Sequence, residues 1–157
     1  ERDLRPIVTR VVEACAELAQ RQGVPVEVVA PALAAAEIDE RRIERVIRNL
    51  VVNAIEHADG TRVTITVATS ATDVACRVRD RGVGMTQEVA DHVFDRFYRA
   101  DTARARTTGG TGLGLSIVKH VMTQHGGSVT VRSMPQEGST FTLALPLTEA
   151  PEAPLTV

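Results

Sequence analysis

The chain has 157 residues, enough for one domain with a hydrophobic core. Hydrophobic residues make up 43% and charged residues 24%, close to globular averages, and the net charge of −2 provides no basic field of the kind that favours nucleic acid. No apolar stretch reaches the ~18 residues that a membrane-spanning helix needs, and no signal peptide opens the sequence.

The first half of the chain predicts two helices around a short strand. Apolar residues recur every three or four positions from about Pro6 to Arg21, and Gly23 ends this helix. Alternation over 24–29 predicts a strand. Asp39 is placed to cap a long second helix that runs to about His57 and is closed by an Asp59-Gly60 turn.

The second half mixes strands with helices. The patterns predict an antiparallel strand pair over 63–67 and 74–78, a helix from Thr86 to about Phe94, a helix over about 112–125, and strands over 128–134 and 140–145. Residues 98–111 bury almost nothing and predict a mobile loop, and the Pro/Ala/Glu-rich tail 148–157 predicts disorder. The chain therefore predicts an α+β domain over 1–147, a two-layer α/β sandwich whose mixed, mostly antiparallel sheet is covered on one face by three helices.

Two amides lie one turn apart on the second predicted helix. Asn49 and Asn53 flank its apolar stripe, where polar side chains are either satisfied core groups or ligands at the mouth of a cleft. The helix alone favours neither interpretation. A carboxamide oxygen is a neutral, hard ligand that suits a Mg²⁺ ion bridging phosphate oxygens.

The first of two glycine-rich segments, Asp80 to Met85, directly follows a strand. An ionised Asp80 only accepts hydrogen bonds, so facing a purine it would bind the adenine amino group and repel the guanine carbonyl. In isolation, a strand-to-helix turn with an Asx-type aspartate is the more common reading.

The second glycine-rich segment, Gly109 to Leu115, opens the third long helix. Free backbone N–H groups and the helix dipole at such a start form a phosphate site, and glycines allow the phosphates to approach. The segment is neither a Walker A loop, since no Gly-Lys-Ser/Thr follows, nor a dinucleotide fingerprint, since no strand precedes it.

Aromatic and basic residues lie between the two glycine segments. Phe94 and Phe97 are either core anchors or a hinge for the loop behind them. Several arginines flank that loop and could reach a γ-phosphate, and we assign Arg99 to this role. They are Arg96, Arg99, Arg104 and Arg106.

In chain order, the sequence shows Asn-Leu-x-x-Asn-Ala at 49–54, Asp-x-Gly-x-Gly at 80–84, Phe-x-x-Phe at 94–97 and Gly-Thr-Gly-Leu-Gly-Leu at 110–115. This succession resembles the N, G1, F and G2 boxes of sensor histidine kinases, within the superfamily shared with gyrase, Hsp90 and MutL. The resemblance covers roughly residues 4–147. It implies the Bergerat fold, which agrees with the sandwich inferred above, and binding of ATP with Mg²⁺.

The resemblance also implies roles for individual residues. Asn53 would bind Mg²⁺ with help from Asn49, Asp80 would hold the adenine amino group, and 98–111 would form the ATP lid. The remaining nucleotide contacts would come from the base pocket and the phosphate loop. These are Gly82, Gly84, Met85, Phe97, Gly110, Thr111, Gly112, Leu113, Gly114 and Leu115.

Two features depart from the family pattern. The position three after Asn53 is commonly Lys or Arg that contacts phosphate, and here it is Glu56. Either another cation or the neighbouring His57 makes that contact, or His57 packs under the lid. The second departure is that no histidine heads a His-Glu pattern followed by proline, so we expect the phosphate acceptor to lie outside this chain. The histidines are His57, His92, His120 and His125.

The activity that the resemblance implies is transfer of the γ-phosphate to a histidine on a separate dimerisation hairpin, in two-component signal transduction. The implied partners are that hairpin domain of the same kinase and a downstream response regulator, without nucleic acid or direct membrane contact. Because residue 1 is Glu rather than Met, we expect this chain to be part of a longer protein. The resemblance implies that this part is monomeric and cytoplasmic, and that the full-length protein is homodimeric and anchored in the membrane.

Three alternatives remain at this point. ATPases of the gyrase or Hsp90 kind carry a Glu one turn before the Mg²⁺-binding Asn as base for water; here Asn49 has no useful basicity, and Glu44 is out of register. Anti-sigma-factor kinases phosphorylate a serine on a partner, but residues 4–8 look more like the connector that leaves a kinase hairpin. A module that only binds nucleotide is disfavoured because all four boxes are present.

Overall fold

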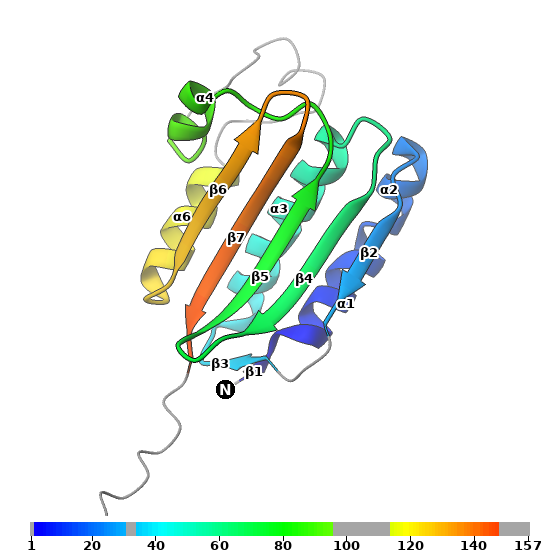
Figure 1. Ribbon diagram of the computed structural model, residues 1–157. Coiled ribbons are helices and arrows are strands. Elements are labelled where there is room, and N and C mark those ends of the chain that lie inside the picture. The colour runs from blue at the N-terminus through cyan, green and yellow to red at the C-terminus, as the bar shows by residue number, and fades with distance from the viewer. Residues whose placement is uncertain (1, 31–33, 96–113, 148–157) are drawn as a thin grey trace, which may run out of the picture.

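A computed structural model of the protein describes residues 2–30, 34–95 and 114–147 (Figure 1). Its main sheet has five strands in the order β2-β4-β5-β7-β6. β2 runs parallel to β4, and every other neighbouring pair is antiparallel, which confirms the predicted mixed, mostly antiparallel sheet. The strands are β2 Val26–Val29, β4 Val63–Thr69, β5 Asp73–Asp80, β6 Ser128–Met134 and β7 Gly138–Pro146.

Helices cover one face of this sheet. In Figure 1 the longer helices all lie behind the strands, and the short helix α4 lies at one end beside β6. This arrangement confirms the predicted two-layer α/β sandwich. The helices are α1 Leu4–Ala14, α2 Ala16–Gln22, α3 Glu40–His57, α4 Gln87–His92 and α6 Gly114–Gln124. None of these described helices has both the length and the apolar character needed to span a bilayer.

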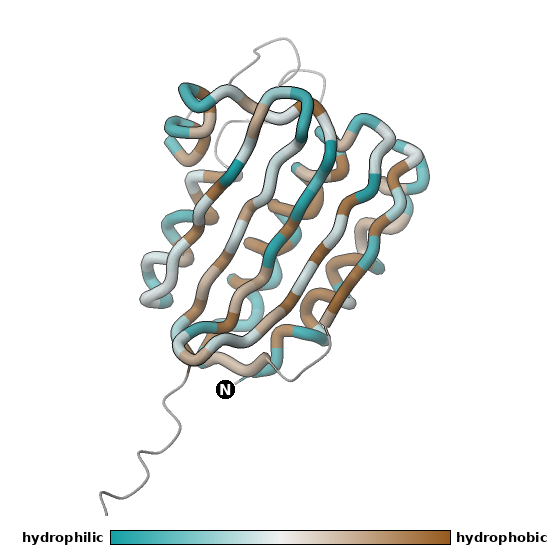
Figure 2. The backbone as a smooth tube through the Cα atoms, in the orientation of Figure 1, coloured by the Kyte–Doolittle hydropathy of each residue, from teal (hydrophilic) through white to brown (hydrophobic). Residues whose placement is uncertain are grey.

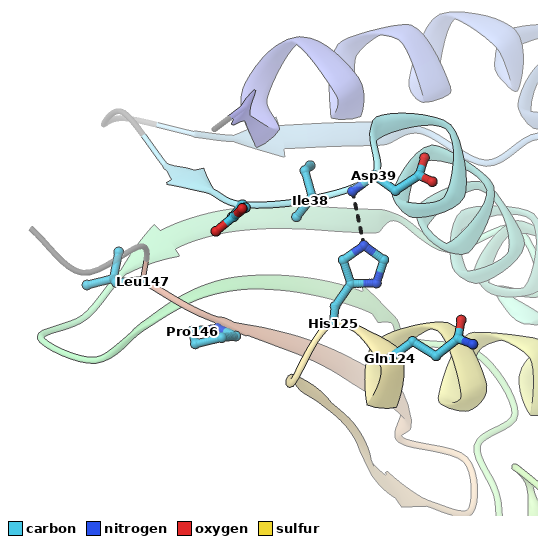
Figure 3. A pocket seen from close by; sticks show the side chains of 7 residues that line it. Ile38, Asp39, Gln124, His125, Pro146 and Leu147 are labelled. Atoms are coloured by element: carbon cyan, nitrogen blue, oxygen red, sulfur yellow. Dashed lines mark hydrogen bonds between the residues drawn. The ribbon is translucent and has the colours of Figure 1, made fainter.

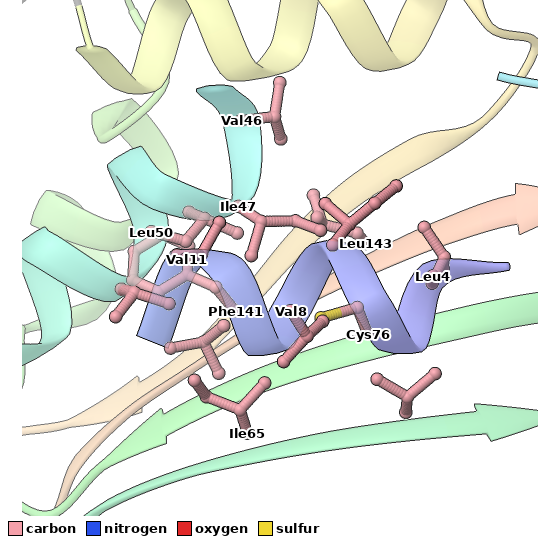
Figure 4. Packing of buried hydrophobic residues seen from close by; sticks show 14 of the residues in the cluster. Leu4, Val8, Val11, Val46, Ile47, Leu50, Ile65, Cys76, Phe141 and Leu143 are labelled. Atoms are coloured by element: carbon pink, nitrogen blue, oxygen red, sulfur yellow. The ribbon is translucent and has the colours of Figure 1, made fainter. Parts of the chain in front are cut away.

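The core lies between the helices and the covered face of the sheet. Hydrophobic and hydrophilic residues alternate along the strands (Figure 2), as expected for a sheet with only one buried face. Figure 4 shows the apolar side chains of α1 and α3 packed against those of the strands. Those labelled there are Leu4, Val8, Val11, Val46, Ile47, Leu50, Ile65, Cys76, Phe141 and Leu143, all of them buried.

The first predicted helix proves to be two helices. Cys15, with φ of −95° and ψ of 0°, separates α1 from α2. Its N–H is shared between the carbonyls of Val11 and Val12. Apolar spacing does not reveal this break, because Cys15 is buried on the same side as it would be in a continuous helix. Gly23 ends α2 in the left-handed conformation, with φ of 67°, as predicted.

A small second sheet is absent from the sequence-based expectations. β1 (Arg2–Asp3) pairs antiparallel with β3 (Ala35–Ala36), and Leu4 N–H donates to the carbonyl of Ala34 over 2.9 Å. Strands of two residues are too short to show alternation, so the sequence carries no signal for them. The pairing fixes the start of α1 beside the segment that leads into α3.

The second long helix is confirmed at both ends. The Asp39 carboxylate accepts a hydrogen bond from the N–H of Arg42 over 3.3 Å, which satisfies a free donor at the start of α3. After His57 the chain turns through Asp59 and Gly60, both with positive φ (53° and 76°). The predicted lid over 98–111 and the predicted disordered tail over 148–157 lie outside the described residues.

Candidate functional site

The described site residues come from three elements. They are Asn49, Asn53 and His57 on α3, then Asp80, Gly82, Gly84 and Met85 at the end of β5 and in the loop behind it, and Gly114 and Leu115 at the start of α6. The other predicted contacts lie outside the described residues. These are Phe97, Arg99, Gly110, Thr111, Gly112 and Leu113.

Asp80, the last residue of β5, is only 2% exposed. Burial raises the pKa of its carboxyl, and backbone N–H groups of Gly82 and Ser139 offset this in part. The 3.0 Å hydrogen bond from Gly82 N–H to Asp80 Oδ1 has the geometry of an Asx turn, the alternative interpretation of this aspartate given above. A turn alone does not require burial, however, and burying a charge costs free energy. A carboxylate offers about four acceptor directions, so Asp80 keeps capacity for a ligand donor.

The Asp80–Met85 loop lies directly against the end of α3. The N–H of Val83 donates to the carbonyl of His57 over 3.4 Å. A Cβ on Gly82 would lie 1.7 Å from that same carbonyl oxygen, closer than any side chain could tolerate. Glycine at 82 is therefore required by close approach of two backbones, and the contact brings β5 and α3 together at the site.

The β6–β7 hairpin closes the other side of this loop. Gly84, with φ of 66°, would place a Cβ 1.9 Å from the carbonyl oxygen of Met134. Gln136 N–H donates to Val83 O over 2.6 Å, and Met85 N–H donates to Ser133 Oγ over 2.7 Å. None of the motifs in the sequence includes these hairpin residues, so the sequence carries no signal for their place at the site.

Asn49 and Asn53 are both half-buried on the flank of α3, as predicted. The Asn49 amide donates to the carbonyl of Gly114 over 3.4 Å, which links α3 to α6 and leaves the amide oxygen as an acceptor. The side chain of Asn53 makes no hydrogen bond to any other residue that the structure describes. Glu56, one turn further, is half-buried, and burial raises the pKa of its carboxyl.

The Asn49 and Asn53 amides fit a magnesium ion that would take most of its coordination from water and from the phosphates of a bound nucleotide. Within residues 2–30, 34–95 and 114–147, no cluster of three or more His, Cys, Asp or Glu side chains could hold a metal. Mg²⁺ does not need such a cluster, because it keeps several waters and is often bound by one or two protein oxygens plus substrate phosphates. The amide oxygens of Asn53 and Asn49 have the required chemistry.

The start of α6 faces the same region. Gly114 is its first residue and is exposed, and Leu115 packs against the core. First-turn N–H groups of a helix lack intrahelical partners and attract anions, so this end of α6 suits phosphate.

Phe94 stacks edge-on against Phe141, with ring centroids 5.9 Å apart, which favours a core-anchor interpretation for Phe94.

An open pocket of about 820 Å³ lies at the other end of α3, lined by residues 37–39, Gln124, His125, Pro146 and Leu147 (Figure 3). His125 Nε2 accepts a hydrogen bond from the N–H of Asp39 over 3.1 Å, and Nδ1 lies 2.8 Å from the Val121 carbonyl oxygen. A carbonyl only accepts, so Nδ1 carries the proton and the ring is neutral. The 18 residues of α3 put this pocket about 25 Å from the Asp80 loop.

Known proteins resemble the chain in both sequence and structure. The family described as "Histidine kinase-, DNA gyrase B-, and HSP90-like ATPase" matches residues 38–149. Sensor histidine kinase MtrB of Mycolicibacterium paratuberculosis is 43% identical over 146 residues, which cover 92% of this chain and 26% of MtrB. Sensor-like histidine kinase SenX3 of Mycolicibacterium smegmatis is 47% identical over 116 residues, which cover 73% of this chain and 30% of SenX3.

Among solved structures, the nucleotide-free catalytic domain of histidine kinase ThkA superposes with a TM-score of 0.80 at 26% identity. The match covers 92% of this chain and 93% of that domain, so the sandwich is the Bergerat fold that the resemblance implied. The chain spans only 26% to 30% of the two curated relatives. In sequence, in fold and in the placement of its motifs, the chain belongs to the histidine kinase-, DNA gyrase B- and HSP90-like ATPase family, as a histidine kinase catalytic domain.

Proposed function

We propose that this domain binds Mg·ATP and transfers its γ-phosphate to a histidine on a separate helical hairpin, in two-component signal transduction. The observation that carries the proposal is the buried carboxylate of Asp80. No cation among the described residues offsets its burial, and the loop that follows it contacts the backbone of His57 on α3, one turn beyond Asn53. A ligand that donates a hydrogen bond would relieve this burial cost.

Base recognition follows from the chemistry of Asp80. The adenine amino group donates to the ionised carboxylate, whereas guanine presents a carbonyl oxygen at the same position and is repelled. Gly82, Gly84 and Met85 carry the backbone that surrounds the base, and Phe97 lies outside the described residues but belongs to the proposed pocket.

The residues that would take the metal and the phosphates lie on α3 and at the start of α6, which are joined by the bond from Asn49 to Gly114. Asn53, with Asn49, would hold Mg²⁺, which would supply positive charge to offset that of the phosphates when bound. The backbone of residues 110–115, including Thr111 and Leu113, would contact the phosphates, and His57 would take the contact that Lys or Arg makes elsewhere in the family. Arg99 would reach the γ-phosphate from the proposed lid over 98–111.

Two observations favour a kinase over an ATPase. Asn49 stands where the ATPases carry their glutamate base, and an amide cannot take a proton from water. Glu44, the carboxylate on α3 that is nearest to Asn49 in sequence, accepts a hydrogen bond from Arg10 Nε over 2.9 Å. Without a glutamate base at position 49, ATP would persist until a histidine attacks the γ-phosphorus, forming a P–N bond as the bond to ADP breaks.

The acceptor is proposed to lie on another segment. Both ring nitrogens of His125 are bonded to backbone groups, and Nδ1 of His92 is bonded to Asp95 over 2.8 Å. The partners would be the histidine-bearing dimerisation hairpin of the same kinase and a response regulator. This domain would be monomeric and cytoplasmic, and the full-length protein homodimeric and anchored in the membrane.

The test measures binding and transfer separately. With Mg²⁺ present, the domain should bind ATP much more tightly than GTP and hydrolyse it very slowly. Adding a histidine-bearing helical hairpin should yield a phosphorylated hairpin whose phosphate is lost in acid and kept in base, as expected for phosphohistidine. Rapid hydrolysis by the isolated domain would favour an ATPase, and an acid-stable phosphate would favour a serine kinase.

A further inference from the structure

We infer that Ser133 is a positioning residue for adenine recognition, because its hydroxyl fixes the Asp80–Met85 loop against the β6–β7 hairpin. The inference rests on the proposed function, since it concerns the pocket in which Asp80 would hold the base. Ser133 itself would not touch the nucleotide. It acts through the loop backbone.

The hydroxyl of Ser133 has three partners. Its oxygen accepts from Met85 N–H over 2.7 Å, and it lies 2.9 Å from Gly138 O and 2.7 Å from Ser139 Oγ. Because a carbonyl only accepts, the single hydroxyl hydrogen of Ser133 goes to Gly138. Ser139 then donates to Ser133, whose oxygen accepts twice. All three bonds are satisfied together only in this arrangement.

The bonds of Ser133 fix both ends of the Asp80–Met85 loop. Ser139 lies on β7 directly opposite Asp80, so its position determines where the buried carboxylate sits. Met85 ends the loop that Asp80 begins. Gln136 N–H adds a second tie between the hairpin and the loop through Val83 O, over 2.6 Å. The loop is thus held under α3 at Gly82 and against the hairpin by Ser133.

Removing this hydroxyl should disturb the pocket rather than the core. β6 is the edge strand of the sheet, and the residues on either side of Ser133, Arg132 and Met134, are exposed. Alanine at 133 removes no apolar packing. It leaves the Met85 N–H, the Gly138 carbonyl and the Ser139 hydroxyl without their partner, a loss that is felt where the base would bind.

The experiment compares base-dependent and base-independent binding in Ser133→Ala. Dissociation constants are measured for Mg·ATP and for Mg·tripolyphosphate, which has no base. We expect Mg·ATP affinity to fall by about tenfold and tripolyphosphate affinity to stay unchanged. Ser133→Thr, which keeps the hydroxyl and suits a strand, should restore ATP affinity to within about twofold. Ser128→Ala, at the other end of β6, is the matched control and should bind like the parent.

Hydrogen exchange gives an independent readout. The Met85 amide should exchange faster in Ser133→Ala, and should be as protected as in the parent in the Thr variant. A Ser133→Ala protein that binds ATP as the parent does, or that loses ATP and tripolyphosphate affinity equally, would overturn the inference while leaving the proposed function intact. A parent protein that binds tripolyphosphate but does not prefer ATP over GTP would remove the proposed role of Asp80, and the inference with it.

Discussion

The two ends of α3 differ in how their polar groups are satisfied. At the N-terminal end, the Asp39 carboxylate caps Arg42 N–H, and His125 accepts from the Asp39 N–H. Arg10 lies beside this end and pairs with both Glu40 and Glu44. Polar groups here have partners within the protein.

At the C-terminal end the reverse holds. Asp80 is buried with only backbone donors to offset the burial, and Asn53 has no hydrogen-bonding partner among the described residues. Glu56 is half-buried, and its carboxyl pKa is raised by desolvation alone. A nucleotide and its metal would supply what these groups lack. One end of the helix thus contributes to stability, and under the proposed function the other would keep binding capacity at a cost in stability.

At the C-terminal end of α3, the largest effect is expected from Gly82→Ala. The new Cβ would lie 1.7 Å from His57 O and 2.9 Å from Ala58 Cα, and both are backbone atoms that cannot rotate away. We expect the free energy of unfolding to fall by about 3 kcal/mol and ATP binding to be lost. Urea denaturation measures the first and calorimetric titration the second.

Gly114→Ala is the matched control for that substitution. Apart from its chain neighbours and its own helix, no described residue has an atom within 4 Å of the position its Cβ would take. Alanine also favours a helix over glycine by up to about 1 kcal/mol, so the unfolding free energy should stay level or rise slightly. Equal midpoints for the parent and Gly82→Ala would show that the two backbones do not meet as closely as described.

The next effect in size should come from Asp80→Asn, which separates function from stability at one residue. An amide loses the charge-assisted bond to the adenine amino group, so ATP affinity should fall by about 30-fold, or about 2 kcal/mol. The unfolding free energy at pH 7 should not fall, because burial disfavours the ionised form of the parent carboxyl and places no such cost on a neutral amide. Titration calorimetry and urea denaturation on the same preparation measure both quantities.

The difference in unfolding free energy between the parent and Asp80→Asn should depend on pH in a predictable direction. Burial raises the pKa of the Asp80 carboxyl in the folded state above its ordinary value. The folded protein therefore holds this proton to a higher pH than the unfolded chain does. Its contribution to stability is fully present below the unfolded pKa and is lost as the pH rises through the folded pKa. The stability advantage of Asp80→Asn should grow over that interval and then level off, and a constant difference would contradict the raised pKa.

A smaller effect is expected at the other end of α3. His125→Ala removes the acceptor for Asp39 N–H and the donor to Val121 O, which should cost about 1–2 kcal/mol of unfolding free energy. Because the site lies about 25 Å away, ATP affinity should not change. His120→Ala, an exposed histidine on the same helix, is the control for loss of an imidazole. A several-fold change in ATP affinity in His125→Ala would show that the two ends are coupled.

Local patterns predict most of the elements. The cap at Asp39, the apolar stripe of α3, the turn at Asp59-Gly60 and the alternation in β4 to β7 all depend on residues close in sequence, and each is confirmed. The break at Cys15 and the two-residue strands β1 and β3 leave no such pattern. Their formation depends on tertiary packing and on pairing across the chain.

The residues of the candidate site are predicted from motif order, whereas their environment comes from the folded structure. Motif order places Asp80, Asn49 and Asn53 in one region, and α3 and β5 bring them there. Neither the burial of Asp80 nor the hydrogen bond that Met85 N–H donates to Ser133 Oγ, 48 residues away, could be predicted from any local pattern. These depend on the register of β6 with β7 and on how closely the loop approaches α3, which only the folded chain determines.

The smallest effect that we expect is at the cap of α3. Asp39→Ala removes the acceptor for Arg42 N–H and should cost about 1 kcal/mol, whereas Asp39→Asn keeps an acceptor oxygen and should cost only a few tenths. His125 bonds the backbone of residue 39 rather than its side chain, so that contact survives in both variants. Urea midpoints rank the three proteins. If Asn at 39 destabilises as much as Ala, the carboxylate stabilises α3 through its charge at the helix start and not through the cap hydrogen bond.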